Sequence, residues 1–349
     1  MQHAAPRPRR SRPSRLGLCL PVLLLAACRG PSLVGADPRP SSDRLPPFAG
    51  RLEDYRAVDE LLYVARRDLD AWHEGRVTTG HGLRPRSERP PPGIRADAGF
   101  ELRTAHVRLR TNVDWEAAVR IAAIAETHVR LLLASLGRDL DLVFPDRPLE
   151  VVVHAARDEY IATLALAVPG HHGWTAWYDD RSRTVHACAE PAPRGALPLR
   201  ADLRHELTHQ ILDNATPRAG RARIPEGHGF WLWEGLAVWS ETLGDTAGQD
   251  TRTPRRERFL SRARRRELTP LAQLVRLSQD EFRGRHYDQC GLLFDHLMAN
   301  GVPRGRRSVV ATLADVLHDR LDGDPYPERL GLGYGTLERQ WLNAHLAER

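Results

Sequence analysis

The 349-residue sequence predicts an α+β fold: a small N-terminal sheet with helices packed on it, followed by a mostly helical C-terminal half. Residues 100–111, FELRTAHVRLRT, alternate between apolar and polar side chains, as a half-buried strand or hairpin does. Residues 149–155, LEVVVHA, are typical of a short buried strand. Beyond residue 197, apolar side chains recur at helical spacing along almost the whole chain.

The N-terminal residues have the pattern of an export signal. Five arginines among the first fifteen residues precede an apolar run, residues 16–27, that is too short to span a bilayer. The run leads into LAAC, which resembles the lipobox of bacterial lipoproteins, with Cys28 as the lipidated residue. We therefore expect a lipoprotein signal peptide over residues 1–27 and a lipid anchor that holds the protein in the bacterial cell envelope, on the periplasmic or surface side. The alternatives are an ordinary signal peptide and a buried helix, and the sequence leaves open which membrane holds the lipid.

The charge of the chain argues against a nucleic-acid partner. Removal of the signal lowers the formal net charge from +6 to about +1, so no basic field remains to attract nucleic acid. In an exported compartment Cys188 and Cys290 can form a disulfide, and the sequence leaves open whether they do. It also leaves the oligomeric state open.

Four segments follow the predicted signal. Residues 28–51, polar and broken by Pro and Gly, are expected to form a flexible tether. Residues 52–75 are predicted to form an N-terminal helix and residues 76–98 a Pro/Arg-rich linker, ahead of the main domain at 99–349. The helix prediction rests on the mostly helical spacing of Leu52, Tyr55, Val58, Leu62 and Leu69.

The first part of the main domain is predicted to alternate helices with strands. A long amphipathic helix begins at Asp114, an N-cap residue type, and ends at Gly137. After the buried strand, a helix covers residues 156–167. Residues 174–180 and 183–190 are expected to be two strands joined by the turn DDRS.

The stretch HELTH, residues 205–209, carries the first chemical signal. It lies on a predicted helix whose buried stripe is formed by Leu199, Leu203, Leu207 and Ile211. His205 and His209 are one turn apart on one face, so both imidazoles can bind the same zinc ion. Glu206 lies about 100° further around the helix, where its carboxylate can act as the general base for a water on the metal. The alternative is that these three polar residues share one helix by chance.

A third ligand separates a zinc hydrolase from a chance match. The metzincin pattern requires Gly and His shortly after the second His, but those positions hold Leu212 and Ala215. The next helical segment, FWLWEGLAVWSETLG, instead provides Glu234 within an apolar run. A carboxylate there is costly to bury without a partner cation. Glu234 is therefore the candidate third ligand.

HELTHQIL followed by WLWEGLAVWSE resembles the peptidase MA-like, or gluzincin, superfamily, and especially its bacterial exported proteins with W-x-x-E-G-L-A. The resemblance covers about residues 100–345 and implies a thermolysin-like catalytic core that hydrolyses peptide bonds in a peptide or protein substrate. It implies that His205, His209 and Glu234 bind one Zn²⁺ and that Glu206 is the general base. Residues Gly235 and Ala237 match small residues that let their helix pack closely against the HELTH helix.

The same resemblance implies a donor for the oxyanion. Several gluzincins use a Tyr from a Y-x-x-G segment on a later helix, and RGRHYDQCGLL resembles that segment, with Tyr287 in the Tyr position. Cys290 stands where the pattern has Gly, and Gly291 follows it. His286 is an alternative donor, and an ordinary aromatic residue near a helix start is the alternative role for Tyr287.

Zinc-bound histidines usually donate their second ring N–H to a carboxylate or a carbonyl. Asp213, one turn beyond His209, and Glu241, two turns beyond Glu234, are the candidates for this role. An exposed carboxylate at a helix end is the alternative for Asp213. Three histidines in predicted loops can line a cleft or simply be solvated: His171, His172 and His228. His228 is also an alternative metal ligand.

The sequence therefore predicts a lipid-anchored zinc metallopeptidase. Two alternatives stay open: a non-catalytic binding lipoprotein at the cell surface, and a zinc amidase or deacylase that acts on non-peptide amides. The substrate and the choice between endo- and exo-cleavage are not determined. The G-x-M-E-N run of aminopeptidases is missing from the sequence, which disfavours that activity.

Overall fold

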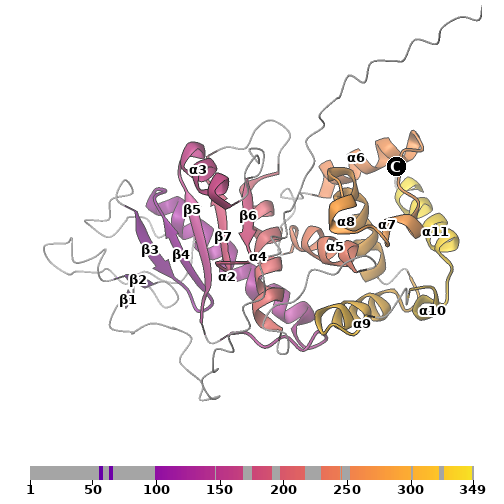
Figure 1. Ribbon diagram of the computed structural model, residues 1–349, viewed down its shortest axis with the longest axis horizontal. Coiled ribbons are helices and arrows are strands. Elements are labelled where there is room, and N and C mark those ends of the chain that lie inside the picture. Colours follow the sequence, from indigo (N-terminus) through magenta and orange to yellow (C-terminus); the bar gives the residue numbers. More distant parts are fainter. Residues whose placement is uncertain are drawn as a thin grey trace, which may run out of the picture.

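A computed structural model places a sheet and a helical half at opposite ends of the molecule, with helix α4 (Leu199–Ala215) between them (Figure 1). This arrangement confirms the predicted α+β class. The structure describes residues 55–57, 63–65, 99–145, 147–167, 175–190, 197–216, 229–243, 245, 252–299, 302–321 and 326–347.

The described residues form one sheet of seven strands in the order β1-β2-β3-β4-β5-β7-β6. Strands β4, β5 and β7 run parallel, and the other neighbouring pairs are antiparallel. Strand β6 is therefore an edge strand, next to the helical half. The strands are β1 (Tyr55–Ala57), β2 (Tyr63–Ala65), β3 (Phe100–Arg103), β4 (Val107–Thr111), β5 (Leu149–His154), β6 (Ala176–Asp179) and β7 (Thr184–Cys188).

The helix predicted over residues 52–75 is wrong where the structure describes this segment. Residues 55–57 and 63–65 are the strands β1 and β2, which pair with each other and extend the sheet from β3. Tyr63 and Val64 have aromatic and β-branched side chains, which favour a strand when a partner edge is present. The open edge of β3 lies far along the chain, so local spacing could not reveal this pairing.

Helices α2 (Trp115–Leu132) and α4 pack on one face of the sheet. Asp114 caps α2, as predicted, because its side chain accepts a hydrogen bond from the Ala117 amide at 2.8 Å. A π-helical turn, η3 (Leu133–Gly137), completes the helix and ends at the predicted Gly137. The main core lies between these helices and the sheet, and includes Val151, Val185, Ala187, Leu203 and Leu207.

The other face of the sheet is covered by α3 (Arg157–Ala167), which was also predicted. Tyr160 and Leu164 of α3 form a separate apolar cluster with Trp177 and Cys188. Side chains alternate along β6 and β7, so this cluster is on the opposite face from the main core. The sheet is thus a central layer, and its two faces have separate apolar clusters.

The helical half is built around α5 (Phe230–Ser240), all of whose residues except Trp239 are buried. A helix that is apolar all round has to be surrounded by other elements, and α8 packs most closely on it. The other elements are α6 (Arg252–Arg264), α7 (Leu271–Leu274), η4 (Gln279–Glu281), α8 (Gly284–Met298), α9 (Gly305–Leu317), α10 (Tyr326–Leu330) and α11 (Tyr334–Ala347).

Two glycines allow the close contact between α5 and α8. A Cβ added to Gly291 on α8 would lie 2.1 Å from Val238 Cγ1 on α5, and one added to Gly235 would lie 3.0 Å from the Cys290 carbonyl. Gly235 therefore packs on α8, and the expectation that it serves the contact with the HELTH helix is corrected. The register of the Tyr287 segment puts Gly291 at the point of closest approach.

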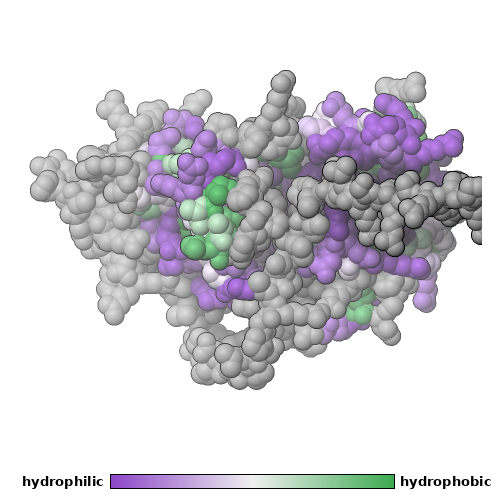
Figure 2. Space-filling view, turned by 45° about the horizontal axis from the view of Figure 1, so that its top comes forward, coloured by the Kyte–Doolittle hydropathy of each residue, from purple (hydrophilic) through white to green (hydrophobic). Residues whose placement is uncertain are grey.

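Cys188 and Cys290, whose pairing the sequence left open, are both buried and free. They are therefore not bonded to each other. Within the described part of the chain, no helix is both long and apolar enough to cross a membrane. Figure 2 shows a coloured surface that is mostly hydrophilic, with an apolar area on the half that contains the sheet.

A buried histidine behind the HELTH helix predicts acid sensitivity. Burial, together with the nearby Arg204 charge, lowers the pKa of His128 from its usual 6.5 to about 3. Between these values the unfolded chain binds a proton that the folded protein does not, so His128 makes stability fall as the pH falls from 6.5 toward 3. The slope from this one group is at most about 1.4 kcal/mol per pH unit.

His128→Gln removes this titration. Urea unfolding at pH 7 and pH 5 is expected to show a smaller loss of stability on acidification in the variant than in the wild type. Other titrating groups are common to both proteins and cancel in the difference. Equal pH dependence in the two proteins would contradict the prediction.

Candidate metal centre

Helix α4 is held from two sides at Thr208, the residue that precedes His209 in HELTH. Thr208 Oγ1 lies 2.9 Å from His128 Nε2 on α2 and 2.6 Å from Ser240 Oγ on α5. All three side chains are buried. Their contacts join α2, α4 and α5, so the face of α4 that bears His205 and His209 is held toward α5.

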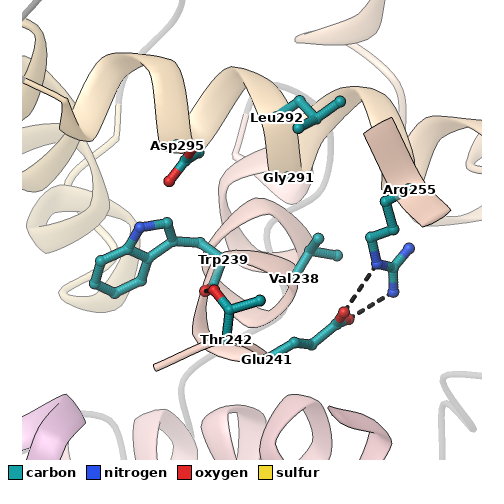
Figure 3. A pocket seen from close by; sticks show the side chains of 8 residues that line it. All are labelled: Val238, Trp239, Glu241, Thr242, Arg255, Gly291, Leu292 and Asp295. Carbon is teal, nitrogen blue, oxygen red and sulfur yellow. Dashed lines mark hydrogen bonds and ion pairs between the residues drawn. The ribbon is translucent and has the colours of Figure 1, made fainter. Parts of the chain in front are cut away.

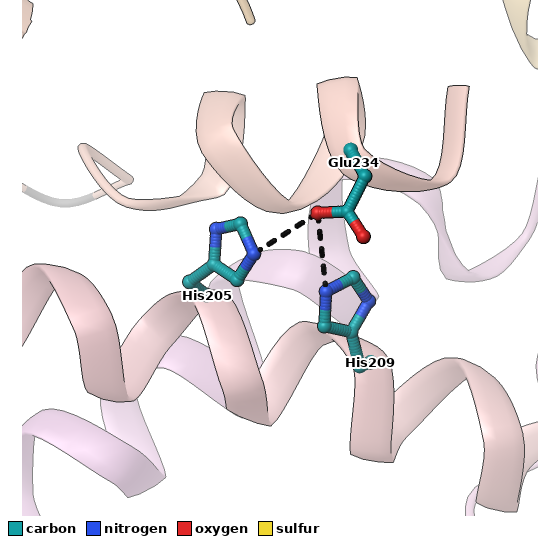
Figure 4. A group of neighbouring side chains, drawn as sticks. All are labelled: His205, His209 and Glu234. Atoms are coloured by element: carbon teal, nitrogen blue, oxygen red, sulfur yellow. Dashed lines mark ion pairs between the residues drawn. The ribbon is translucent and has the colours of Figure 1, made fainter. Parts of the chain in front are cut away.

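His205, His209 and Glu234 converge between α4 and α5 (Figure 4). Glu234 Oε2 lies 3.2 Å from His205 Nε2 and 3.6 Å from His209 Nε2. The three candidate ligand atoms all lie within 4.8 Å of one another, and all three residues are buried. The structure therefore brings together the three residues that the sequence proposed.

The polar atoms of this group suit a cation. Glu234 Oε2 faces both ring nitrogens but forms no well-aligned hydrogen bond with a described residue. Burial alone would raise the pKa of Glu234, but His209 and His205 lower it to about 2, so the carboxylate is charged. Two imidazole nitrogens and one carboxylate oxygen can thus hold a metal ion in a site shielded from water.

Glu241 supports His205, as the sequence predicted for it. His205 Nδ1 lies 3.0 Å from Glu241 Oε1, on the side of the ring away from Glu234. Burial alone would raise the pKa of Glu241, but the Arg255 guanidinium lowers it below its usual range. An ionised Glu241 accepts a hydrogen bond from Nδ1–H, which leaves Nε2 of His205 as the nitrogen that faces Glu234.

Asp213 was considered as the partner of His209, but it is hydrogen-bonded to Tyr178. Its Oδ2 accepts a hydrogen bond from the Tyr178 hydroxyl at 2.5 Å. His209 Nδ1 has no hydrogen-bond partner among the described residues. Asp213 is buried, so the exposed helix-end role does not apply to it either. Its carboxylate instead attaches the edge strand β6 to α4.

Glu206 is close to the same strand. Its Oε2 accepts a hydrogen bond from the backbone N–H of Tyr178 at 3.0 Å. The Tyr178 amide belongs to the edge strand β6, so the carboxylate of Glu206 lies where the edge of the described sheet meets α4. Glu206 is half-buried and is not one of the three clustered ligands, as its position one residue after His205 predicts.

Tyr287 lies beside the cluster, with its ring centroid 6.1 Å from that of His205. Burial and the carboxylates of Glu234 and Glu206 raise its pKa well above the usual value, so its hydroxyl keeps its proton at neutral pH. His286 was the alternative donor, but its Nδ1 accepts from the Arg283 amide and its Nε2 lies 3.1 Å from Thr269 Oγ1. Its ring nitrogens are therefore occupied at the start of α8.

No family model matches the chain, and no curated protein matches it. Any function has to rest on the geometry of the site.

Two contacts in the site were not predicted from the sequence. Trp233 stacks on His209, with ring centroids 5.5 Å apart and planes inclined by 9°. This indole covers one face of the His209 ring. Arg255 reaches Glu241 from α6. Cys28 and the loop histidines lie outside the described residues: His171, His172 and His228.

Proposed function

We propose that this protein is a zinc metallopeptidase of the gluzincin type, anchored by lipid at Cys28 in the bacterial cell envelope. The observation that carries the proposal is the convergence of His205, His209 and Glu234 from two helices, with Glu206 beside them. Two imidazoles and one carboxylate are a donor set found in catalytic zinc sites, which keep one position for water or substrate.

Bound Zn²⁺ supplies a Lewis acid that polarises a carbonyl oxygen and makes water more acidic. His205, His209 and Glu234 would hold it. Trp233, stacked on His209, and Glu241, bonded to His205, restrict the rotation of the two rings. The ligands are thus oriented by contacts that are present in the protein itself.

Glu206 has the role of general base. Its carboxylate accepts a proton from the attacking water and passes that proton to the leaving amine. The Tyr178 amide holds Oε2 by one hydrogen bond, which orients the carboxylate without neutralising it. Because Tyr178 is on β6, an edge strand of the described sheet, the base lies at the edge of that sheet.

Tyr287 has the role of oxyanion donor. Its hydroxyl stays protonated at neutral pH, and its ring lies next to His205. A hydrogen bond from this hydroxyl to the developing oxyanion lowers the barrier to attack. The same arrangement acts on any amide carbonyl, so a substrate screen has to include peptides, proteins and non-peptide amides.

Elemental analysis of the purified full-length protein tests the proposal. After exposure to zinc and removal of the excess, the wild type is expected to retain about one zinc per chain. Glu234→Ala is expected to lose it, because two imidazoles alone bind zinc weakly. Glu257→Ala, which removes an exposed carboxylate on α6, is the control and is expected to retain it.

A wild type that holds no zinc after this treatment would overturn the proposal. The binding-lipoprotein alternative would then take its place. Retention of full zinc by Glu234→Ala would show that the third ligand has been assigned to the wrong residue.

A further inference from the structure

A line of buried charges connects helix α8 with the metal-binding helix. Asp288 on α8 lies 3.2 Å from Arg255 Nη1, and Arg255 in turn contacts Glu241 at the end of α5. Glu241 reaches His205 Nδ1 at 3.0 Å. The order Asp288, Arg255, Glu241, His205 therefore leads from the outer helices to a candidate metal ligand.

The contact between Arg255 and Glu241 is bidentate (Figure 3). Arg255 Nε donates to Glu241 Oε2 at 2.8 Å, and Nη2 donates to Oε1 at 2.6 Å. A planar guanidinium bound through two parallel hydrogen bonds fixes the orientation of the carboxylate as well as its charge. The carboxylate has little freedom to turn away from His205.

These charged side chains are shielded from solvent, so each of them needs a counter-charge within the protein. The side chains of Glu241, Asp288 and Arg255 are 1%, 2% and 11% exposed. A buried carboxylate without a counter-charge is strongly unfavourable. Any conformation that leaves the carboxylate unpaired is therefore raised in free energy. Arg255 is the cation that both carboxylates share.

Two further arginines of α6 separate this role from simple helix docking. Arg258 donates two hydrogen bonds to Asp288, and Arg262 donates one. In the described structure, neither of them contacts Glu241. All three arginines therefore attach α6 to α8, but Arg255 alone of the three also reaches the carboxylate behind His205.

We propose that Arg255 is a positioning residue for the metal centre: it orients Glu241, which orients the imidazole of His205, and Asp288 fixes Arg255 in place. This inference rests on the proposed function and adds to it two residues that touch neither metal nor substrate. With Glu241 held in this position, His205 presents Nε2 to the metal in one ring orientation. Loss of Arg255 releases Glu241 and weakens metal binding.

Zinc affinity of the full-length protein, measured by competition with a chromophoric chelator, tests the proposal. Arg255→Met is expected to weaken zinc binding by about 10- to 100-fold, the usual effect of losing a group that orients a ligand. Arg258→Met is the matched control: it removes two hydrogen bonds to Asp288 but none to Glu241, and is expected to change the affinity less than about threefold.

Glu241→Gln distinguishes positioning from general destabilisation. If Arg255 acts through Glu241, the two substitutions are not additive, and Arg255→Met weakens zinc binding by less than about threefold in the Glu241→Gln background. The d–d absorption of the cobalt-loaded protein adds a spectroscopic readout. It is expected to change in Arg255→Met and to match the wild type in Arg258→Met.

Arg255→Met leaves Glu241 as an unpaired buried charge, so the fold of each metal-free variant is checked by circular dichroism. If this variant does not fold, Arg255→Lys and the double variant replace it, since both avoid the unpaired charge. Arg255→Lys keeps the positive charge but lacks the planar guanidinium that forms two parallel hydrogen bonds. It is expected to have a zinc affinity between those of the wild type and Arg255→Met.

Equal zinc affinity in the wild type and in the Arg255 variants would overturn this inference while leaving the proposed function intact. Additive effects of the Arg255 and Glu241 substitutions would do the same, as would a loss in Arg258→Met as large as that in Arg255→Met. Lack of zinc binding by the wild type overturns the proposed function itself, and this inference with it.

Discussion

Replacement of Glu206 by Gln is expected to reduce turnover of a peptide substrate by about 10²- to 10⁴-fold, the usual contribution of a general base. Zinc content is expected to stay at the wild-type level, because Glu206 is not among the clustered ligands. Gln is close to Glu in shape, and its amide oxygen can still accept the Tyr178 N–H. The substitution therefore removes the proton acceptor and leaves the local structure in place.

The measurement is the turnover number for a peptide found in the substrate screen, with zinc content determined on the same preparations. Glu257→Gln, on the exposed side of α6, is the control and is expected to keep wild-type activity. Retention of more than a tenth of the activity by Glu206→Gln would contradict the role of general base. Loss of zinc from this variant would mean that Glu206 helps to hold the metal.

Gly291→Ala is expected to destabilise the protein by about 3 kcal/mol, the upper end of the usual range for overpacking. The added Cβ would lie 2.1 Å from Val238 Cγ1 and 2.8 Å from Val238 Cβ. Rotation of the valine side chain cannot relieve the second contact, so α5 and α8 have to move apart. Glu234 and Glu241 lie on or next to α5, and zinc affinity is therefore expected to fall as well.

Urea unfolding of the metal-free protein measures this loss. Gly284→Ala, at the start of the same helix, is the matched control, because its added Cβ meets nothing within 4 Å. Val238→Ala combined with Gly291→Ala removes the clashing methyl groups and is expected to be more stable than Gly291→Ala alone. Wild-type stability in Gly291→Ala would show that the helices are not in close contact at this residue.

The parts of the site that the sequence predicted are those fixed by local geometry. The spacing of His205 and His209 places them on one helix face wherever the helix packs. Glu234 could be identified because a carboxylate inside an apolar run needs a cation. Asp114 marks the start of a helix for a similarly local reason, since its side chain accepts a hydrogen bond from a backbone N–H of the first turn.

The parts that the sequence did not predict depend on how distant segments pack. Arg255 lies in an arginine-rich helix, and only the docking of α6 on α8 brings it to Glu241. Asp213 is one turn beyond His209, yet the nearby hydroxyl of Tyr178 takes its carboxylate. The strands at 55–57 and 63–65 depend on the free edge of β3. Gly235 packs against α8, because the atoms closest to a Cβ at this position belong to α8 and not to α4.

The contact of Thr208 with His128 and Ser240 bears on how the proposed centre would take up an ion. It fixes α4 against both α2 and α5 through protein groups alone, at the residue next to His209. The three ligands are therefore preorganised, and little conformational entropy remains to be lost when an ion enters. In a zinc finger the ion drives folding, whereas these protein contacts lead us to expect that the proposed centre folds without an ion. Chelation and reloading are then expected to exchange the ion reversibly at a folded site, so that the proposed ion can be varied while the protein stays folded.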